Sequence, residues 1–399
     1  MAAGGGWLVV DAGAAALLAG TADNNNNNNN EEDNKNEDNC DVPLPIVTQA
    51  VQADDIPQVV RAVRSALGEG RRVERVLLTA RETPRLASGA IEEILEVADG
   101  DGAVSVPGGI CFVPGAALSL FGAGVAAGGV VADIGHGGVT LSTINDCLRA
   151  VSVRHLDELG GRDLAQFQTR LVEGRNAEPA WTRDEHRAVR ESGAILSVAP
   201  SSNEYRELMT ALEGIGNCGD GWYEQAVAPG APQVFQLPDG KAMAVRGERF
   251  AVPEALFQPH LVGKSAMGLS AQLWDLARNC GPPTPPVVVT GGGAGFPGLR
   301  RRILHDLDEL GGLHWRASNA SSNASAESPG IPAGDVRIVT TMHSPAAPLS
   351  PDVGAVDLAA WRGGLVLAAV AAEWLDELAV TRTKWLEEGA RCLPAAGFV

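Results

Sequence analysis

The chain has 399 residues, of which 45% are hydrophobic and 20% are charged, a composition typical of a globular protein with two or more complete domain cores. Its formal net charge of −18 argues against non-specific binding to nucleic acid or to an anionic membrane surface. No apolar run reaches the length of about eighteen residues that a membrane span needs, and we expect no secretory signal, because the N-terminus lacks a basic region. The six cysteines form no C-x-x-C pair, which favours a reducing compartment and neither a disulfide framework nor a zinc site.

The first predicted element is a hairpin near the start of the chain. The apolar run Trp7–Val10 leads into Asp11 and Gly13, and a second apolar run ends at Gly20. This order predicts a strand, a tight turn and a second strand. Glycines at such a tip let backbone N–H groups approach a phosphate, and an adjacent aspartate can hold Mg²⁺. An ordinary glycine-bearing hairpin is the alternative.

The segment 22–41 interrupts this pattern. It contains seven consecutive asparagines followed by Glu, Asp, Asn and Lys. Because it has no apolar face to bury, we expect a disordered surface insertion. Helical apolar spacing then predicts helices over Val59–Leu67 and Ile91–Val97. A buried strand is predicted over Val73–Thr79, and a short helix over Pro114–Phe121.

A second unit repeats the pattern of the first. The apolar run Gly129–Ala132 leads into Asp133 and a glycine-rich tip, Gly135 to Gly138, followed by the β-rich run Val139–Ile144. Each unit is a strand followed by the motif Asp-x-Gly. Two such units suggest a duplicated fold with a nucleotide held between two hairpin tips. The segment Gly160–Leu164 is expected to break the chain and begin a helix, with Asp163 near its N-terminus.

The remaining elements follow in order. Arg183–Val198 is predicted to be a helix, and Leu237–Gly240 a turn between two strands. Glu248–Pro259 is predicted to be a loop entering a helix. The run Val287–Thr290 enters the loop Gly291–Gly295 and then a helix, an arrangement suited to contact an anion or a nucleotide. The last predicted elements are the helix Leu299–Leu310, a helix opened by a turn at Trp361 and continuing through Leu378, and the segment Trp385–Cys392.

The run from Leu237 to Pro259 resembles the signature of actin and actin-related proteins. Other segments agree with that family in order: Val9–Gly13, Val76–Thr79, Leu118–Phe121, Asp133 with Gly135, Gly161–Leu164, Gly291–Gly292 with Pro297–Gly298, Trp361–Gly364 and Arg391–Leu393. The resemblance implies an α/β actin-like ATPase fold, with duplicated ribonuclease-H-like halves around a nucleotide cleft. It divides the chain into a first half, 1–121, a second half, 122–340, and a C-terminal segment, 341–399, that returns to the first half. The small domain after the first phosphate loop is reduced to a remnant, Val42–Val51.

The same resemblance implies a nucleotide site for ATP or ADP with Mg²⁺. Asp11 and Asp133 would hold the metal through water, although the site could also be empty. Arg187, Arg190 and Glu191 would lie on the adenosine side, with a solvated helix face as the alternative. The residues that would contact the nucleotide are Asp11, Gly13, Asp133, Gly135, Gly137, Gly161, Arg187, Arg190, Glu191, Gly291 and Gly292.

Departures from the family pattern bear on catalysis. Ala14, Ala15 and Leu18 replace donor and cationic side chains of the first loop. His136 stands where a second aspartate is usual, and it could contact a phosphate or simply be exposed. Gly115 stands where the family has a glutamine that orients the attacking water. Leu141 stands where the family has a histidine. Losing these contacts should cost several kcal/mol of transition-state stabilisation, so we expect no catalytic residues and at most a weak ATPase.

These features favour a structural, non-polymerising actin-related subunit of a larger cytoskeletal or chromatin-associated complex. Its partners would be other protein subunits, such as actin or actin-related proteins, and neither nucleic acid nor a membrane. The expected location is the cytoplasmic cytoskeleton, with the nucleus as an alternative. A working ATPase of the actin, Hsp70 and sugar-kinase superfold, or a divergent filament-forming actin, are the competing hypotheses.

Overall fold

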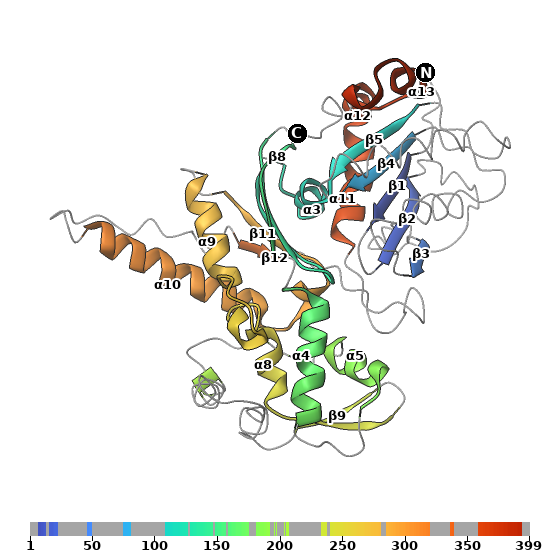
Figure 1. Cartoon of the computed structure of the whole chain (residues 1–399). Coiled ribbons are helices and arrows are strands. Elements are labelled where there is room, and N and C mark those ends of the chain that lie inside the picture. The colour runs from blue at the N-terminus through green and yellow to red at the C-terminus, as the bar shows by residue number, and fades with distance from the viewer. Residues whose placement is uncertain are drawn as a thin grey trace, which may run out of the picture.

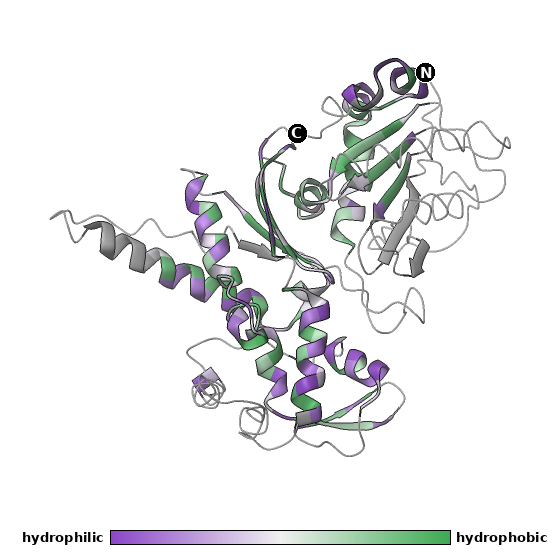
Figure 2. Ribbon diagram, in the orientation of Figure 1, coloured by the Kyte–Doolittle hydropathy of each residue, from purple (hydrophilic) through white to green (hydrophobic). Residues whose placement is uncertain are grey.

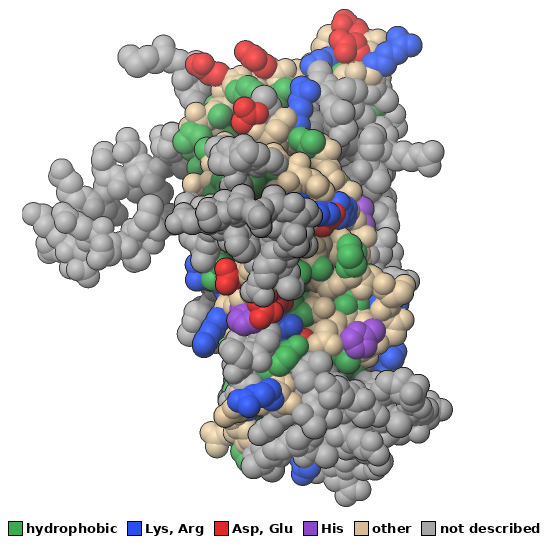
Figure 3. Space-filling model, turned by 90° about the vertical axis from the view of Figure 1, so that its left-hand side faces the viewer, with side chains coloured by type: hydrophobic (Ala, Val, Ile, Leu, Met, Phe, Trp, Pro, Cys, Tyr) green, Lys and Arg blue, Asp and Glu red, His purple; other side chains and the backbone are tan. Residues whose placement is uncertain are grey.

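The computed structural model describes residues 7–12, 16–22, 46–49, 75–80, 108–126, 128–146, 148–156, 159–174, 181–191, 195, 197, 203, 205–206, 233–237, 240–280, 285–319, 336–338 and 358–392. They form two lobes, each built around a β-sheet (Figure 1). None of the helices in these ranges is both long and apolar enough to cross a membrane. On the face drawn in Figure 3, acidic and basic side chains are interspersed over the described surface.

The first lobe contains a five-stranded sheet of order β3-β2-β1-β4-β5. The pairs β1–β2 and β2–β3 are antiparallel, whereas β1–β4 and β4–β5 are parallel. Antiparallel neighbours can be joined by tight turns, while parallel neighbours need crossover connections. The strands are β1 (Trp7–Ala12), β2 (Ala16–Ala22), β3 (Ile46–Gln49), β4 (Arg75–Ala80) and β5 (Ile110–Pro114).

The second lobe repeats this topology. Its five-stranded sheet, read from the hairpin side, has the order β8-β7-β6-β11-β12. Again two antiparallel pairs are followed by two parallel pairs. Asp11 and Asp133 occupy the same next-to-last position of the corresponding strands β1 and β6, so the predicted duplication is confirmed. The strands are β6 (Gly129–Ile134), β7 (Val139–Ile144), β8 (Ala150–Leu156), β11 (Val287–Thr290) and β12 (Val336–Ile338).

Helices and one small hairpin complete the described structure. In Figure 2 the coloured strands are mostly hydrophobic, whereas α4, α9 and the coloured part of α10 alternate between hydrophobic and hydrophilic residues, as expected for helices that cover a core on one side. The α-helices are α3 (Gly115–Gly122), α4 (Gly161–Gly174), α5 (Arg183–Glu191), α8 (Glu248–Glu254), α9 (Leu269–Asn279), α10 (Leu299–Asn319), α11 (Ala359–Val370), α12 (Ala372–Leu378) and α13 (Arg382–Glu388). The other elements are β9 (Gln233–Gln236), β10 (Ala242–Val245), η1 (Pro259–Val262), η2 (Gly292–Gly295) and η4 (Gly389–Cys392).

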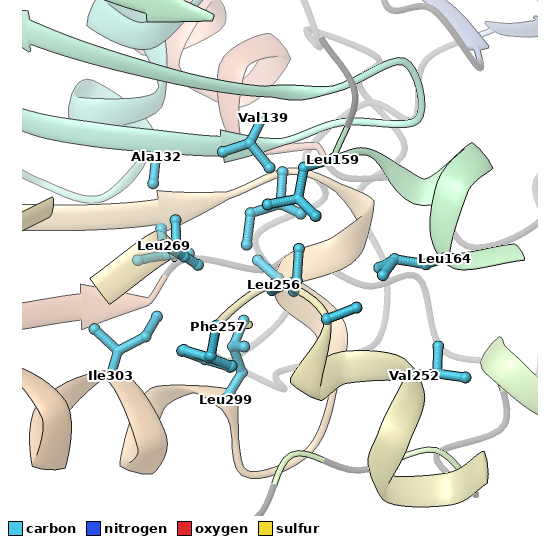
Figure 4. Close-up of a cluster of buried hydrophobic side chains, with 14 of the residues drawn as sticks. Ala132, Val139, Leu159, Leu164, Val252, Leu256, Phe257, Leu269, Leu299 and Ile303 are labelled. Carbon is cyan, nitrogen blue, oxygen red and sulfur yellow. The ribbon is translucent and has the colours of Figure 1, made fainter. Parts of the chain in front are cut away.

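Two hydrophobic cores are formed by the described residues. The first lies within the second lobe, where side chains from β6, β7, α4, α8, α9 and α10 converge (Figure 4). The second joins the lobes, because it combines β1, α3 and α11 with β6, β7 and β11. Strand β11 faces both cores: Val287 and Val289 point into the first, and Val288 into the second. Burial of these apolar surfaces provides the main stabilisation.

A buried ion pair between Arg302 and Glu254 links α10 to α8 inside the second lobe. The Arg302 guanidinium donates two hydrogen bonds to the Glu254 carboxylate, at 2.5 and 3.0 Å. Arg302 also donates from Nε to Asp306 at 2.9 Å and lies over the Phe257 ring at 4.3 Å. Such a bidentate pair satisfies the charges that burial would otherwise penalise.

The C-terminal helices pack on the first lobe. A Cβ atom added to Gly363 of α11 would lie 1.8 Å from the Leu118 carbonyl oxygen of α3, so the two helices cross at backbone contact. Val380 pairs with Ile110 in an isolated bridge, and Arg75 of β4 donates to Asp376 of α12 at 2.8 Å.

Several boundaries differ from the sequence predictions, among them the end of α10, which continues past the predicted Leu310 to Asn319. The helix predicted over Arg183–Val198 ends at Glu191, and the Ser197 N–H instead donates to the Pro297 carbonyl at 2.8 Å. Glu248–Pro259 begins as the helix α8 and continues as turns, rather than as a loop that enters a helix. The helix predicted through Leu378 starts before Trp361 and breaks into α11 and α12, because the backbone at Ala371 turns to φ −132° and ψ 34°.

Several predictions fall outside the described residues. These are the insertion 22–41, apart from Ala22 at the end of β2, and the helices over 59–67 and 91–97. Of the small-domain remnant, only β3 is described.

Candidate nucleotide-binding site

The tip of the β6–β7 hairpin forms the centre of the candidate site. The Gly135 N–H donates to the Gly138 carbonyl at 2.9 Å and closes the tip. The first turn of α4 lies directly against it: the Gly161 N–H donates to the Gly135 carbonyl, and the Arg162 N–H to the His136 carbonyl, each at 2.9 Å. The predicted residues Gly135, Gly137 and Gly161 are therefore brought together.

Close packing explains the glycine that precedes α4. A Cβ atom on Gly160 would lie 2.4 Å from the Gly138 nitrogen, a distance that real side chains do not reach. The Gly160 N–H donates to the Asp163 carboxylate at 3.0 Å, in the manner of a capping contact at a helix start. This fixes the helix against the hairpin tip.

The glycine loop after β11 approaches the same tip from the neighbouring strand. Gly291 has φ +89°, and a Cβ atom there would lie 2.4 Å from Oδ1 of Asp133. This is a backbone conformation in which glycine is strongly favoured. A Cβ atom on Gly292 would meet nothing within 4 Å, so this glycine is exposed and open to a ligand. The two predicted glycines therefore differ: Gly291 is closely packed, whereas Gly292 faces open space, and its contact with a nucleotide stays a prediction.

The first hairpin presents Asp11 beside β4. In the sheet Asp11 pairs with Leu18 on one side and with Thr79 on the other. The Thr79 hydroxyl donates to Oδ1 of Asp11 at 2.6 Å, which orients the carboxylate. Thr79 was not among the predicted site residues, although its place at the end of a predicted strand was a usable signal. Gly13 lies outside the described residues.

The arginines of α5 are positioned by α4. Arg190 is half-buried and donates to Oε1 of Gln168 at 2.8 Å. Gln168 is fully buried and was missed by sequence reasoning, because nothing local distinguishes it from other polar helix residues. Arg187 is also half-buried, so the two arginines do not form a simple solvated face. Glu191 ends the helix, and its side chain lies outside the described part of the chain.

His136 sits in a positive environment at the tip. Burial lowers the pKa of its imidazole below the usual value, and the charges of Arg162, Arg190 and Arg183 lower that pKa further, while Asp163 opposes them. Because a phosphate is negative, this environment suits a phosphate group better than it suits the imidazolium cation.

The positions expected to orient water carry no polar side chain. Leu141 is fully buried in the core of the second lobe. Gly115 is the first residue of α3, and a Cβ atom there would have no neighbour within 4 Å. Neither residue can orient or deprotonate a water molecule.

The residues fit a nucleotide better than they fit a dedicated metal site. Glycines leave space for a ligand beside the loop after β11, and the charges of three arginines lower the pKa of His136 at the hairpin tip. Among the described residues, no three His, Cys, Asp or Glu side chains come together in a group that could hold a metal ion. Binding of Mg²⁺ through water by Asp11 and Asp133 stays a prediction, since one or two carboxylates with substrate phosphates can be sufficient for that ion.

Comparison with known proteins agrees with this geometry. A family model described as Actin matches residues 105–395, most of the chain. The chain is also 27% identical over 205 residues to actin-related protein 2 of Caenorhabditis briggsae. That alignment covers 49% of this chain and 47% of the relative, so the chain matches about half the length of this curated relative.

Proposed function

Because the chain belongs to the actin family, and therefore has the actin-like ATPase fold, we propose that it is a nucleotide-binding structural subunit of a larger protein assembly, with little or no ATP turnover. One observation carries the proposal: Leu141, at the position of a water-orienting histidine, is a core side chain of β7. Gly115 adds no side chain that could compensate. Binding is retained by the glycine approaches and the arginines, whereas the groups that would activate water are absent from these positions.

An apolar stripe on the C-terminal helices supports a role in assembly. Val366 and Val370 are 45% and 70% exposed on α11, and Trp374 on α12 is 36% exposed. Val366 and Val370 lie four residues apart on one side of α11, and Trp374 follows on α12 beyond the break at Ala371. Such a stripe suits a partner helix that inserts apolar side chains. The partners would be protein subunits, such as actin or another actin-related protein, and the location the cytoskeleton, with the nucleus as an alternative.

The catalytic part of the proposal is tested by ATP turnover of the purified protein beside a conventional actin. We expect a rate at least about tenfold lower, since each 1.4 kcal/mol of lost transition-state stabilisation is a factor of ten. Turnover at the rate of conventional actin would contradict the proposal and favour the working ATPase.

The structural part is tested by sedimentation and by partner capture. The protein should stay in the supernatant in Mg-ATP and polymerising salt, whereas pelleted filaments would favour a filament-forming actin. Val370→Asp should abolish stoichiometric co-purification with partner subunits. Val234→Asp is a matched control, because Val234 is 64% exposed on β9 in the other lobe. Equal effects of the two substitutions would exclude the stripe as the partner surface.

A further inference from the structure

The apolar stripe formed by Val366, Val370 and Trp374 has an arginine at its α11 end. Arg362 precedes Val366 by four residues, so the two side chains lie on the same side of α11. Figure 1 shows α11 beside α3, with α12 following it in the chain. The stripe is therefore continued, about 6 Å further along the axis of α11, by a cationic side chain.

Arg362 is half-buried, and among the described residues its charge has no partner. Its Nε atom is completely buried and has no hydrogen-bond acceptor in that part of the chain. No ion pair between two described residues includes Arg362, whereas Arg75, Arg154 and Arg302 each have a carboxylate partner. Because a buried N–H without an acceptor costs free energy, an acceptor supplied by another molecule would stabilise the complex.

The other end of the stripe is acidic. Glu373 and Glu377 are exposed on α12, before and after Trp374 in the sequence. A third carboxylate of this helix, that of Asp376, is paired with Arg75. The apolar stripe therefore lies between a cation on α11 and two carboxylates on α12. A partner with the opposite charge at each end would be attracted, and a partner with the reverse polarity would be repelled.

We propose that the stripe binds an amphipathic helix of a partner protein, with a carboxylate at one end of its apolar face that pairs with Arg362 and a basic residue at the other end that lies along α12. The inference rests on the proposed function, in which the stripe is the partner surface, and it adds the charge pattern of that partner. A single helix readily provides this pattern, because acidic residues stabilise its first turn and basic residues its last turn.

Fluorescence anisotropy with a designed peptide tests the pairing. The probe is a labelled helical peptide with blocked termini, a row of leucines spaced four residues apart, one glutamate a turn before the leucines and one lysine a turn after them. Replacing its glutamate by glutamine should raise the dissociation constant for the wild-type protein about tenfold, since a charged hydrogen bond is lost. The Arg362→Gln protein should bind the two peptides equally.

Arg301→Gln is the matched control, because Arg301 is an exposed arginine of α10 in the other lobe. This variant should distinguish the glutamate peptide from the glutamine peptide as the wild type does. Equal loss of discrimination in both arginine variants would overturn the pairing with Arg362, since the effect would then come from net charge alone.

Charge reversal provides a rescue. Arg362→Glu should weaken binding of the glutamate peptide by more than about tenfold, because two carboxylates would meet. A peptide with lysine in place of that glutamate should restore the affinity to within about threefold of the original pair. Failure of the lysine peptide to bind a folded Arg362→Glu protein, with folding verified by circular dichroism, would contradict the proposal.

Stability separates a binding role from a structural one. Arg362→Met keeps a long side chain and removes the buried N–H that lacks an acceptor, so its thermal unfolding midpoint should be no lower than that of the wild type. A clearly lower midpoint would show that the guanidinium supports the fold of this chain and would overturn its assignment to a partner.

The failure of this inference can be distinguished from that of the proposed function. If the wild type binds the glutamate and glutamine peptides equally and Val370→Asp abolishes that binding, the stripe remains the partner surface and only the role of Arg362 is overturned. If the wild type binds none of the peptides, both the inference and the assignment of the stripe as the partner surface are overturned.

Discussion

At the scale of single residues, glycines decide how closely the strand ends approach one another. Gly291 brings the loop after β11 against the Asp133 carboxylate, and Gly160 brings α4 against the Gly138 nitrogen. A side chain at either position would overlap with polar atoms of the hairpin. Gly292, one residue away from Gly291, faces open space. Adjacent glycines in one motif can therefore be in different environments, one closely packed and one open.

Gly291→Ala should lower the free energy of unfolding by about 1–3 kcal/mol, because its positive φ is strained for alanine and the new Cβ would displace Asp133. Gly292→Ala should change that free energy by no more than about 0.5 kcal/mol, while it lowers nucleotide affinity if the base lies against this face. Urea denaturation of both variants provides the measurement. Equal unfolding midpoints for the two variants would contradict the packing role assigned to Gly291.

At the scale of elements, one helix crossing attaches the C-terminal segment to the first lobe. Gly363 of α11 lies against the Leu118 carbonyl of α3, and neighbouring Gly364 lies against a methyl group of Val9. Helices approach this closely only where side chains are absent from the contact. Trp361 and Leu367 of α11 are completely buried. The close approach that Gly363 and Gly364 allow therefore lets α11 bury its large apolar side chains against the first lobe.

Gly363→Ala should force α3 and α11 apart and cost about 1–3 kcal/mol or more, as overpacking does. Ala369→Gln on the exposed side of α11 is the control and should stay within about 0.5 kcal/mol of the wild type. The measurement is the thermal unfolding midpoint of each variant. A Gly363→Ala protein as stable as the control would show that the helices can separate at no cost.

At the scale of the whole molecule, the two lobes share a core. Strand β11 belongs to the sheet of the second lobe, yet Val288 packs with Trp7, Leu118 and Trp361 in the core that joins the lobes. Its neighbours Val287 and Val289 pack only within the second lobe's core. Strand β11 therefore contributes side chains both to the core of its own lobe and to the core that the two lobes share.

Val288→Ala should cost about 2 kcal/mol and reduce amide hydrogen-exchange protection in β1 and α3 as well as in β7, because the shared core supports all three. Val289→Ala removes the same methyl groups from the other core and should reduce protection in the second lobe alone. Identical protection patterns for the two variants would mean that the two cores do not stabilise different parts of the molecule.

The sequence by itself determined the repeated strand–Asp–x–Gly units and, through the run from Leu237 to Pro259, the family. Both depend on local features, since a short apolar run that ends in a glycine turn and is followed by a second run predicts a hairpin without reference to the rest of the chain. The identical topology of the two sheets confirmed this duplication. The actin-like fold was therefore predictable.

Only the tertiary structure decided how the candidate site is assembled. Thr79 orients Asp11, Gln168 holds Arg190, and Leu141 is a core side chain. The two hydrogen bonds join different elements, so the sequence could mark Thr79 as the end of a strand but could not show which partner its hydroxyl meets. The end of α5 at Glu191 has the same cause, because the later backbone bonds to the loop at Pro297. The first turn of α4 is likewise brought against the hairpin tip by backbone hydrogen bonds from Gly161 and Arg162.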